Sequence, residues 1–352
     1  MNRVVCYLTN VALDREKGTG ALCLRPVLWV LSLAYGSVVM FVRWLYEAGI
    51  FKVFQAPVPV ISVGNLTAGG TGKTPFVAML CKVLMEEGYN PMVLTRGFMG
   101  GQGGASDEAE MLKELVGPRV FTGADRVRSF QSSFKAGGYD CVILDDGFQQ
   151  WRFKRDLDII LVDSREPLGN GFLIPRGILR ESPGMLRRAG VLVLTRVDRV
   201  STEELDLLKA RLKRIASDAV LFQGVHRVCA VRDVFGEGTI EQHRITGPAA
   251  AFCAIGDPDS FKRTLKGAGI DLKVFIPFED HYRYITRDVK NIVGECREKK
   301  LGNVFITHKD YVKLKDFRDL FNGIRLIVID VEFELTYGKT ELVSIIRRLR
   351  RS

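Results

Sequence analysis

Short apolar runs alternate with longer amphipathic segments along most of the chain. The runs end in polar or glycine-containing turns, as buried parallel strands do, and they lie at residues 58–63, 91–95, 140–146, 157–163 and 191–198. Amphipathic stretches follow several of them, at residues 75–87, 107–115 and 201–215. Strands that alternate with helices at this spacing predict a parallel sheet with right-handed crossovers.

The apolar density falls around residues 227–247, and a second series of strands and helices begins at residue 248. The weak stretch indicates a linker or the edge of a subdomain. We therefore expect an α/β fold in three parts: an N-terminal helical segment at 1–56, a core at 57–240 and a smaller C-terminal α/β subdomain at 241–352.

The N-terminal segment contains an uncharged apolar stretch at residues 26–42, followed by Trp44 and Tyr46 as possible interfacial side chains. A spanning helix needs about 20 apolar residues, so this stretch is borderline. Charged residues at 14–17 disfavour a secretory signal. Three interpretations stay open: a helix that rests in or enters one membrane face, a soluble helix packed on the core, and a true span.

Composition narrows the class of protein. The chain has 352 residues, 47% of them hydrophobic, which excludes wholesale disorder. Lys and Arg number 51 and Asp and Glu 41, and the resulting charge of +10 favours an anionic partner: nucleic acid, a phosphorylated substrate or an acidic membrane face. The seven cysteines form no CxxC pair, so a disulfide framework or a zinc site has little support.

The strongest chemical signal is the glycine-rich turn at residues 61–76, which joins a strand to a helix. Its candidate phosphate-binding residues are Gly69, Gly70, Thr71, Gly72, Lys73 and Thr74. Lys73 can reach the β- and γ-phosphates of a nucleotide, and the Thr74 hydroxyl can bind Mg²⁺. The strict GxxxxGK[ST] pattern is not met, because Thr67 stands at its first glycine position. The context still predicts a P-loop NTPase-like parallel sheet flanked by helices.

A second apolar run, at residues 140–146, ends in Asp145 and Asp146. Beside a phosphate loop, such a strand end typically supplies the carboxylate that orients Mg²⁺. Either aspartate fits this role.

In this order, several segments resemble the tetraacyldisaccharide 4′-kinases, the lipid A 4′-kinases of Gram-negative bacteria. They lie at residues 64–75, 94–98, 106–112, 144–149, 173–183, 251–261, 278–284 and 307–314. The resemblance implies ATP-dependent phosphorylation of the 4′-hydroxyl of an acylated glucosamine disaccharide 1-phosphate, with Mg²⁺, at the cytoplasmic face of the inner membrane. The apolar N-terminal helix would then rest in or anchor to that membrane surface. Neither nucleic acid nor an obligate protein partner is expected.

The resemblance also implies roles for individual residues. Asp107 matches the general base of the family, and His281 matches a histidine that orients or tunes it. Arg180 and Glu181 match a loop on the substrate side. Two positions depart from the family pattern: Ser106 replaces a glycine before the base, and His308 stands where a glutamate is usual.

An alternative function is a P-loop nucleotide switch, a GTPase or ATPase at the membrane. Residues 195–198 follow a strand and resemble a guanine-reading [NT]KxD segment, although Arg196 occupies the lysine position. A non-enzymatic membrane adaptor would leave the glycine-rich turn unexplained.

Overall fold

The computed structural model describes residues 3–97, 107–135, 138–236, 238–239, 247–280 and 282–349. The chain forms two compact units. The first consists of Met1–Gly101, Val116–Val225 and Phe333–Ser352, and the second of Gln102–Leu115 and His226–Glu332. The two units are described separately below.

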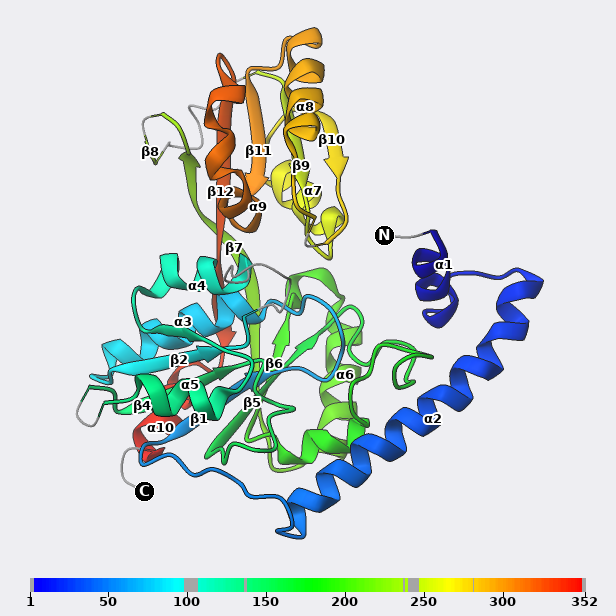
Figure 1. Cartoon of the computed structure of the whole chain (residues 1–352), viewed down its shortest axis with the longest axis vertical. Coiled ribbons are helices and arrows are strands. Elements are labelled where there is room, and N and C mark those ends of the chain that lie inside the picture. Colours follow the sequence, from blue (N-terminus) through cyan, green and yellow to red (C-terminus); the bar gives the residue numbers. More distant parts are fainter. Residues whose placement is uncertain are drawn as a thin grey trace. The chain divides into compact units, whose positions relative to one another are not determined.

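A parallel sheet forms the centre of the first unit, with the strand order β7-β6-β5-β1-β4-β2-β3 (Figure 1). Its strands are β1 (Val60–Gly64), β2 (Pro91–Thr95), β3 (Val120–Thr122), β4 (Cys141–Asp145), β5 (Leu157–Asp163), β6 (Val191–Thr195) and β7 (Val220–Asp233). Every residue of β1, β2, β4 and β6 is buried, which explains their continuous apolar sequences. The predicted parallel sheet is confirmed.

Helices flank this sheet. They are α3 (Lys73–Glu86), α5 (Arg126–Ser133), α6 (Thr202–Ile215), α10 (Lys339–Leu349), and the short 3₁₀ turns η1 (Pro183–Arg188) and η2 (Val197–Arg199). The helix α6 begins at a capping box, in which the Ser201 hydroxyl accepts from the Glu204 amide and the Glu204 carboxylate accepts from the Ser201 amide. At the other end of the chain, the Tyr89 hydroxyl donates to the carbonyl of Ile346 in α10 over 2.9 Å.

The second unit has its own parallel strands, in the order β10-β9-β11-β12. They are β9 (Ala249–Cys253), β10 (Leu272–Pro277), β11 (Asn303–Thr307) and β12 (Arg325–Tyr337). Its helical elements are α4 (Asp107–Val116), α7 (Pro258–Gly267), α8 (Thr286–Glu298), α9 (His308–Leu314) and η4 (Lys315–Phe321), and the short strand β8 (Gly238–Thr239) pairs with β7. Two apolar clusters form its core, one around Phe252 and Leu326 and one around Phe261 and Ile327.

These units differ from the three parts expected at 1–56, 57–240 and 241–352. Residues 333–352 return to the first unit through the end of β12 and through α10, and residues 102–115 belong to the second. Residues 227–233 form part of β7 rather than a linker. A strand pairs through its backbone and tolerates partly exposed polar side chains, so the low apolar density did not mark a linker. It does lie beside a division between the units, because the second unit resumes at His226.

The N-terminal helices are α1 (Arg3–Ala12) and α2 (Thr19–Glu47). By length and composition α2 could cross a membrane, with a mean hydropathy of 1.7 over its most apolar window. One side of it packs on the first unit: the Ser32 hydroxyl donates to the carbonyl of Leu173 and the Tyr35 hydroxyl to that of Arg180, each over 3.1 Å. Large apolar side chains on α2 stay exposed, among them Val30, Val38 and Phe41.

The end of β1 lies against the turn after β4, and this close contact can be tested by substitution. A Cβ atom added to Gly64 would lie 2.6 Å from Cβ and 2.9 Å from the backbone nitrogen of Phe148. We expect Gly64→Ala to lower the free energy of unfolding by about 1–3 kcal/mol, because the turn after β4 must move. Gly70→Ala is the matched control, since its added Cβ meets no atom within 4 Å. Urea unfolding measures both, and equal stabilities for the two variants would contradict the expectation.

Candidate active site

The glycine-rich turn between β1 and α3 is the first part of the site. Gly72 has a φ of 85°, a left-handed conformation that glycine adopts without strain, and α3 begins directly after it at Lys73. The side chain of Asn65 lies beneath the turn, fully buried. Its amide nitrogen donates to the carbonyl of Thr67 over 2.7 Å, and its amide oxygen accepts from Nζ of Lys73 over 3.0 Å. Asn65 therefore fixes both the turn and its lysine.

Asp146, directly after β4, is the anion at the centre of this site. Lys73 Nζ lies 3.6 Å from its Oδ1, and Nη1 of Arg180 donates to Oδ1 and Oδ2 over 3.0 and 2.8 Å. Burial alone would raise the pKa of Asp146, but Lys73, Arg180 and Arg126 outweigh it and hold the pKa below 3.8. The residue has a positive φ of 51°, uncommon for a side chain other than glycine. Asp146 is thus an ionised carboxylate that joins two cations.

Asp145 precedes it at the end of β4 and is buried. Its Oδ2 accepts from the Thr95 hydroxyl of β2 over 2.9 Å, and its carbonyl accepts from Nη2 of Arg126 over 3.2 Å. These contacts tie the acidic strand end to two further elements, β2 and α5.

The loop that carries Arg180 pairs with the glycine-rich turn. The Arg180 amide donates to the carbonyl of Leu66 over 2.8 Å, and the Ala68 amide donates to that of Ile178 over 2.7 Å. Because Tyr35 of α2 binds the Arg180 carbonyl, α2 reaches the phosphate turn through a single residue. Because the Arg180 side chain donates to Asp146, Arg180 lies beside the phosphate turn.

Arg196 supports the turn from β6. Its Nη2 donates to the carbonyl of Gly70 over 2.9 Å, and its Nη1 binds the carboxylate of Asp163. The guanidinium is therefore engaged in holding the turn, which disfavours the guanine-reading interpretation of residues 195–198.

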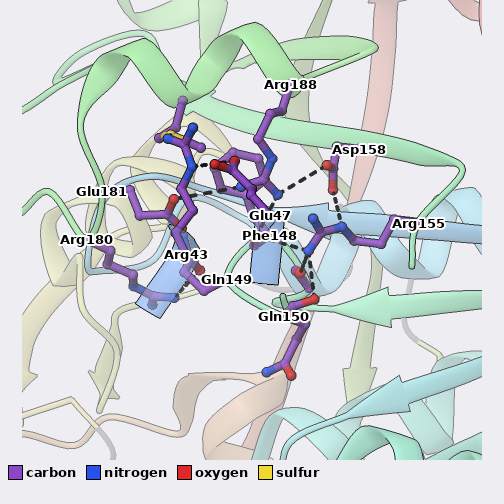
Figure 2. Close-up of polar contacts among 12 residues, drawn as sticks. Arg43, Glu47, Phe148, Gln149, Gln150, Arg155, Asp158, Arg180, Glu181 and Arg188 are labelled. Carbon is purple, nitrogen blue, oxygen red and sulfur yellow. Dashed lines mark hydrogen bonds and ion pairs between the residues drawn. The ribbon is translucent and has the colours of Figure 1, made fainter. Parts of the chain in front are cut away.

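Glu181 lies beside this site in an arginine-rich cluster (Figure 2). Arg188 approaches Oε2 of Glu181 to 3.8 Å and pairs with Asp158 over 3.4 Å. Its guanidinium stacks on Trp151, with Cζ 3.9 Å from the ring centre. Arg155 also pairs with Asp158 over 3.3 Å. Glu181 is buried, and burial raises its pKa above 4.5 despite these arginines.

The second unit holds the other predicted catalytic residues. Asp107 is the first residue of α4, and its Oδ2 lies 3.0 Å from Nζ of Lys313 in α9. Lys309, one turn earlier, contacts Glu108 over 3.7 Å and Asp280 over 3.0 Å. The two acidic motifs, around Asp107 and Asp280, therefore meet at one lysine. His281 lies outside the described residues.

Comparison with known proteins identifies the family of this chain. The sequence model of the family described as tetraacyldisaccharide-1-P 4′-kinase matches residues 24–350. The chain belongs to this family. The resemblance seen in the sequence motifs is confirmed.

Named members of the family extend over most of the chain. The tetraacyldisaccharide 4′-kinase of Syntrophus aciditrophicus is 37% identical over 84% of this chain and 85% of its own length. That of Halothermothrix orenii is 32% identical over 97% of each. A crystal structure of LpxK from Aquifex aeolicus in complex with ATP superposes with a TM-score of 0.72, at 27% identity over 93% of this chain and 99% of the other.

The donor atoms available in this tetraacyldisaccharide-1-P 4′-kinase family member suit Mg²⁺, a hard cation that prefers oxygen. Thr74 in the first turn of α3 and the carboxylates of Asp145 and Asp146 are hard oxygen donors. In the part of the chain that the structure describes, no three His, Cys, Asp or Glu side chains form a metal-binding group. Mg²⁺ in kinases is held by one or two protein oxygens together with substrate phosphates and water, so these donors fit.

Several residues of the site were missed by the sequence predictions. Asn65 and Gln149 lie within the family-like segments, and the Gln149 amide donates to the Asn65 carbonyl over 3.2 Å. Thr95 also lies within such a segment, whereas Arg126 lies in none of them. The position of Asn65 directly after a buried strand was a usable signal. Arg126 offered none, because its role depends on its burial under β4.

Proposed function

We propose that this chain transfers the γ-phosphoryl group of ATP to the 4′-hydroxyl of a tetraacylated glucosamine disaccharide 1-phosphate. The observation that carries the proposal is the placement of Lys73, held by Asn65 and Asp146 at the start of α3, in a chain that matches this kinase family over residues 24–350. Backbone amides of a glycine-rich turn and the N-terminus of a helix bind phosphate oxygens, and a lysine there stabilises charge on the transferred group.

Asp145 and Asp146 have different roles in this proposal. Asp146 already joins Lys73 and Arg180, so its negative charge is largely compensated. Asp145, oriented by the Thr95 hydroxyl, is the better carboxylate to hold Mg²⁺ together with Thr74. When bound, Mg²⁺ would shield the charges of the β- and γ-phosphates. Asp146 would keep Lys73 aligned with those phosphates.

Asp107 is the proposed general base. A sugar hydroxyl is a weak nucleophile at neutral pH, and a carboxylate that accepts its proton assists the attack. Lys313 orients the Asp107 carboxylate from α9. Because Lys309 contacts both Glu108 and Asp280, the neighbours of Asp107 and of His281 lie together, which supports an orienting role of His281 toward Asp107.

The lipid substrate fits the side of the first unit where α2 packs. A cavity of about 360 Å³ there is lined by Val42 and Tyr46 of α2 and by residues 124–127 and 149–153, which include Asp125 and Arg126. It joins apolar helix surface to the polar residues next to Asp145 and Asp146, as a pocket for an acylated sugar requires. We assign the disaccharide head to this pocket, and Glu181 and its arginines to the adjoining wall.

We further propose that α2 lies along the cytoplasmic face of the inner membrane, with its exposed apolar side in the lipid. Ser32, Tyr35 and Arg43 of α2 contact Leu173, Arg180 and Met185 of the same unit. Nearer its start, Arg25 pairs with Asp14, which in turn binds Arg176. A spanning orientation would carry the polar loop around Arg180 into the hydrocarbon, where its charge is costly. Placement in one face leaves that loop in water and buries mainly apolar side chains.

The central experiment incubates purified protein with Mg-ATP and the acylated disaccharide 1-phosphate and looks for a bis-phosphorylated product. We expect Lys73→Ala to remain folded and to lose about 10²–10³ of the rate, because the transition-state charge loses its nearest cation. Lys82→Ala, which removes an exposed lysine of the same helix, is the control. ATP hydrolysis at one rate with and without the lipid, and no lipid product, would refute the kinase assignment.

The Asp107–His281 pair is tested by a double-mutant cycle on kcat. If the two residues act as one unit, Asp107→Ala and His281→Ala each lower kcat strongly and leave ATP affinity nearly unchanged. The double variant should then be barely slower than Asp107→Ala. Losses that multiply in the double variant would show that the residues act independently.

The membrane placement is tested by charges on the exposed side of α2. The change is Val30→Asp with Val38→Asp, at two exposed positions that leave Ser32 and Tyr35 in place. We expect at least about tenfold weaker co-flotation with anionic liposomes, because carboxylates resist entry into the bilayer. Leu207→Asp, at an exposed apolar position of α6, is the control. Unchanged flotation of the double variant would place the membrane contact elsewhere.

A further inference from the structure

His308, the first residue of α9, is buried in the second unit between two carboxylates. Its Nε2 lies 2.7 Å from Oε2 of Glu114 in α4, and its Nδ1 lies 2.8 Å from Oδ1 of Asp330 in β12. A neutral imidazole donates from one nitrogen and presents a lone pair at the other. With a carboxylate facing each nitrogen, only the imidazolium donates to both.

Charged groups from every neighbouring element complete this network. Lys315 of η4 binds Oε1 of Glu114, and Arg232 of β7 binds both oxygens of Asp330. Nη2 of Arg232 also lies 3.5 Å from Nδ1 of His308. The ring of Tyr311 lies 6.2 Å from the imidazole ring, measured between centres. With His308 neutral, the other four charges already cancel, but a lone pair then faces a carboxylate. Protonation removes that repulsion.

The network holds the C-terminal half of α4, and Asp107 begins the same helix. Glu114 lies seven positions after Asp107, a rise of about 10 Å. At the start of α4, Lys313 and Lys309 of α9 contact Asp107 and Glu108. The helix α4 is short and half of its residues are charged, so it depends on these charged contacts as well as on its buried residues Ala109, Leu112 and Val116.

We propose that His308 is a positioning residue: its imidazolium fastens α4 to α9 and β12, and thereby fixes Asp107 for proton transfer. The part concerning Asp107 rests on the proposed function. Burial alone would lower the pKa of His308, but the bonds to Asp330 and Glu114 outweigh it and raise the pKa above 6.5. The stabilisation that the imidazolium of His308 gives is complete below pH 6.5, the ordinary pKa of histidine. It is lost as the pH rises through the raised pKa of His308 in the folded protein.

The ring titration is measured by NMR on the full chain. The sequence has four histidines, and the signal that disappears in His308→Gln belongs to His308. We expect its midpoint above 6.5, and a lower midpoint in Glu114→Gln, which removes one facing carboxylate. Glu110→Gln makes the same charge change on the same helix without a contact to His308, and should leave the midpoint nearly unchanged. A wild-type midpoint at or below 6.5 overturns the proposal.

Hydrogen exchange and kinetics test the positioning. The protection factors of α4 amides should fall as His308 deprotonates, while those of α8 in the same unit stay constant. The alkaline limb of kcat should follow the His308 midpoint and move to lower pH in Glu114→Gln. At neutral pH, His308→Gln should lower kcat about tenfold with the KM for ATP within about twofold. The positioning role is wrong if the protection of the α4 amides does not change as His308 deprotonates. It is also wrong if the alkaline limb of kcat does not move with the His308 midpoint.

Failure of the proposed function would give different results from failure of the His308 proposal. If Asp107 is not the base, Asp107→Ala keeps most of the activity, while the NMR midpoint and the α4 protection still follow His308. The two failures therefore leave separate signatures.

Discussion

The site of the first unit depends on one carboxylate that two cations from distant segments share. Asp146 lies beside Lys73 at the start of α3 and accepts from Arg180 in the loop before η1. Asp146 is partly buried, with its side chain 33% exposed, and an ionised carboxylate withdrawn from water is stabilised by such partners. Removal of Asp146 would leave both cations without this carboxylate, whereas removal of either cation would leave it paired with the other. The same carboxylate sits directly after β4, so the central sheet sets the position of the whole group.

In the second unit, carboxylates are also stabilised by cations, but in a longer chain of alternating charges. Lysine, glutamate, histidine, aspartate and arginine alternate from η4 through α4, α9 and β12 to β7, and the carboxylates lie between cations. Both carboxylates have a lowered pKa, although burial alone would raise it. An apolar contact would hold α4 at any pH. A network whose central member is a histidine holds it according to pH, because histidine alone among these groups has its ordinary pKa near neutrality.

The sequence allowed the fold class and the phosphate turn to be predicted, because both depend on local order. Buried parallel strands are continuous apolar runs, and a strand, glycines and Gly-Lys-Thr before a helix form a contiguous pattern. The boundaries of the units depend on contacts between distant segments, such as α4 with α9 and α10 with Tyr89, and no local pattern reports them. Arg126 and Arg196 are two arginines among many in the sequence; only the fold shows what they bind.

The helix α2 belongs to the frame of the active site as well as to the proposed membrane surface. Its Tyr35 hydroxyl binds the backbone of Arg180, and the side chain of Arg180 binds Asp146. Two hydrogen bonds therefore separate the apolar helix from the carboxylate that aligns Lys73. A shift of α2 would displace the Arg180 backbone, and with it the hydrogen bond from the Arg180 amide to the carbonyl of Leu66 in the glycine-rich turn. If lipid binding fixes α2, it fixes Arg180 as well, so the proposed membrane surface would also order the glycine-rich turn and Lys73.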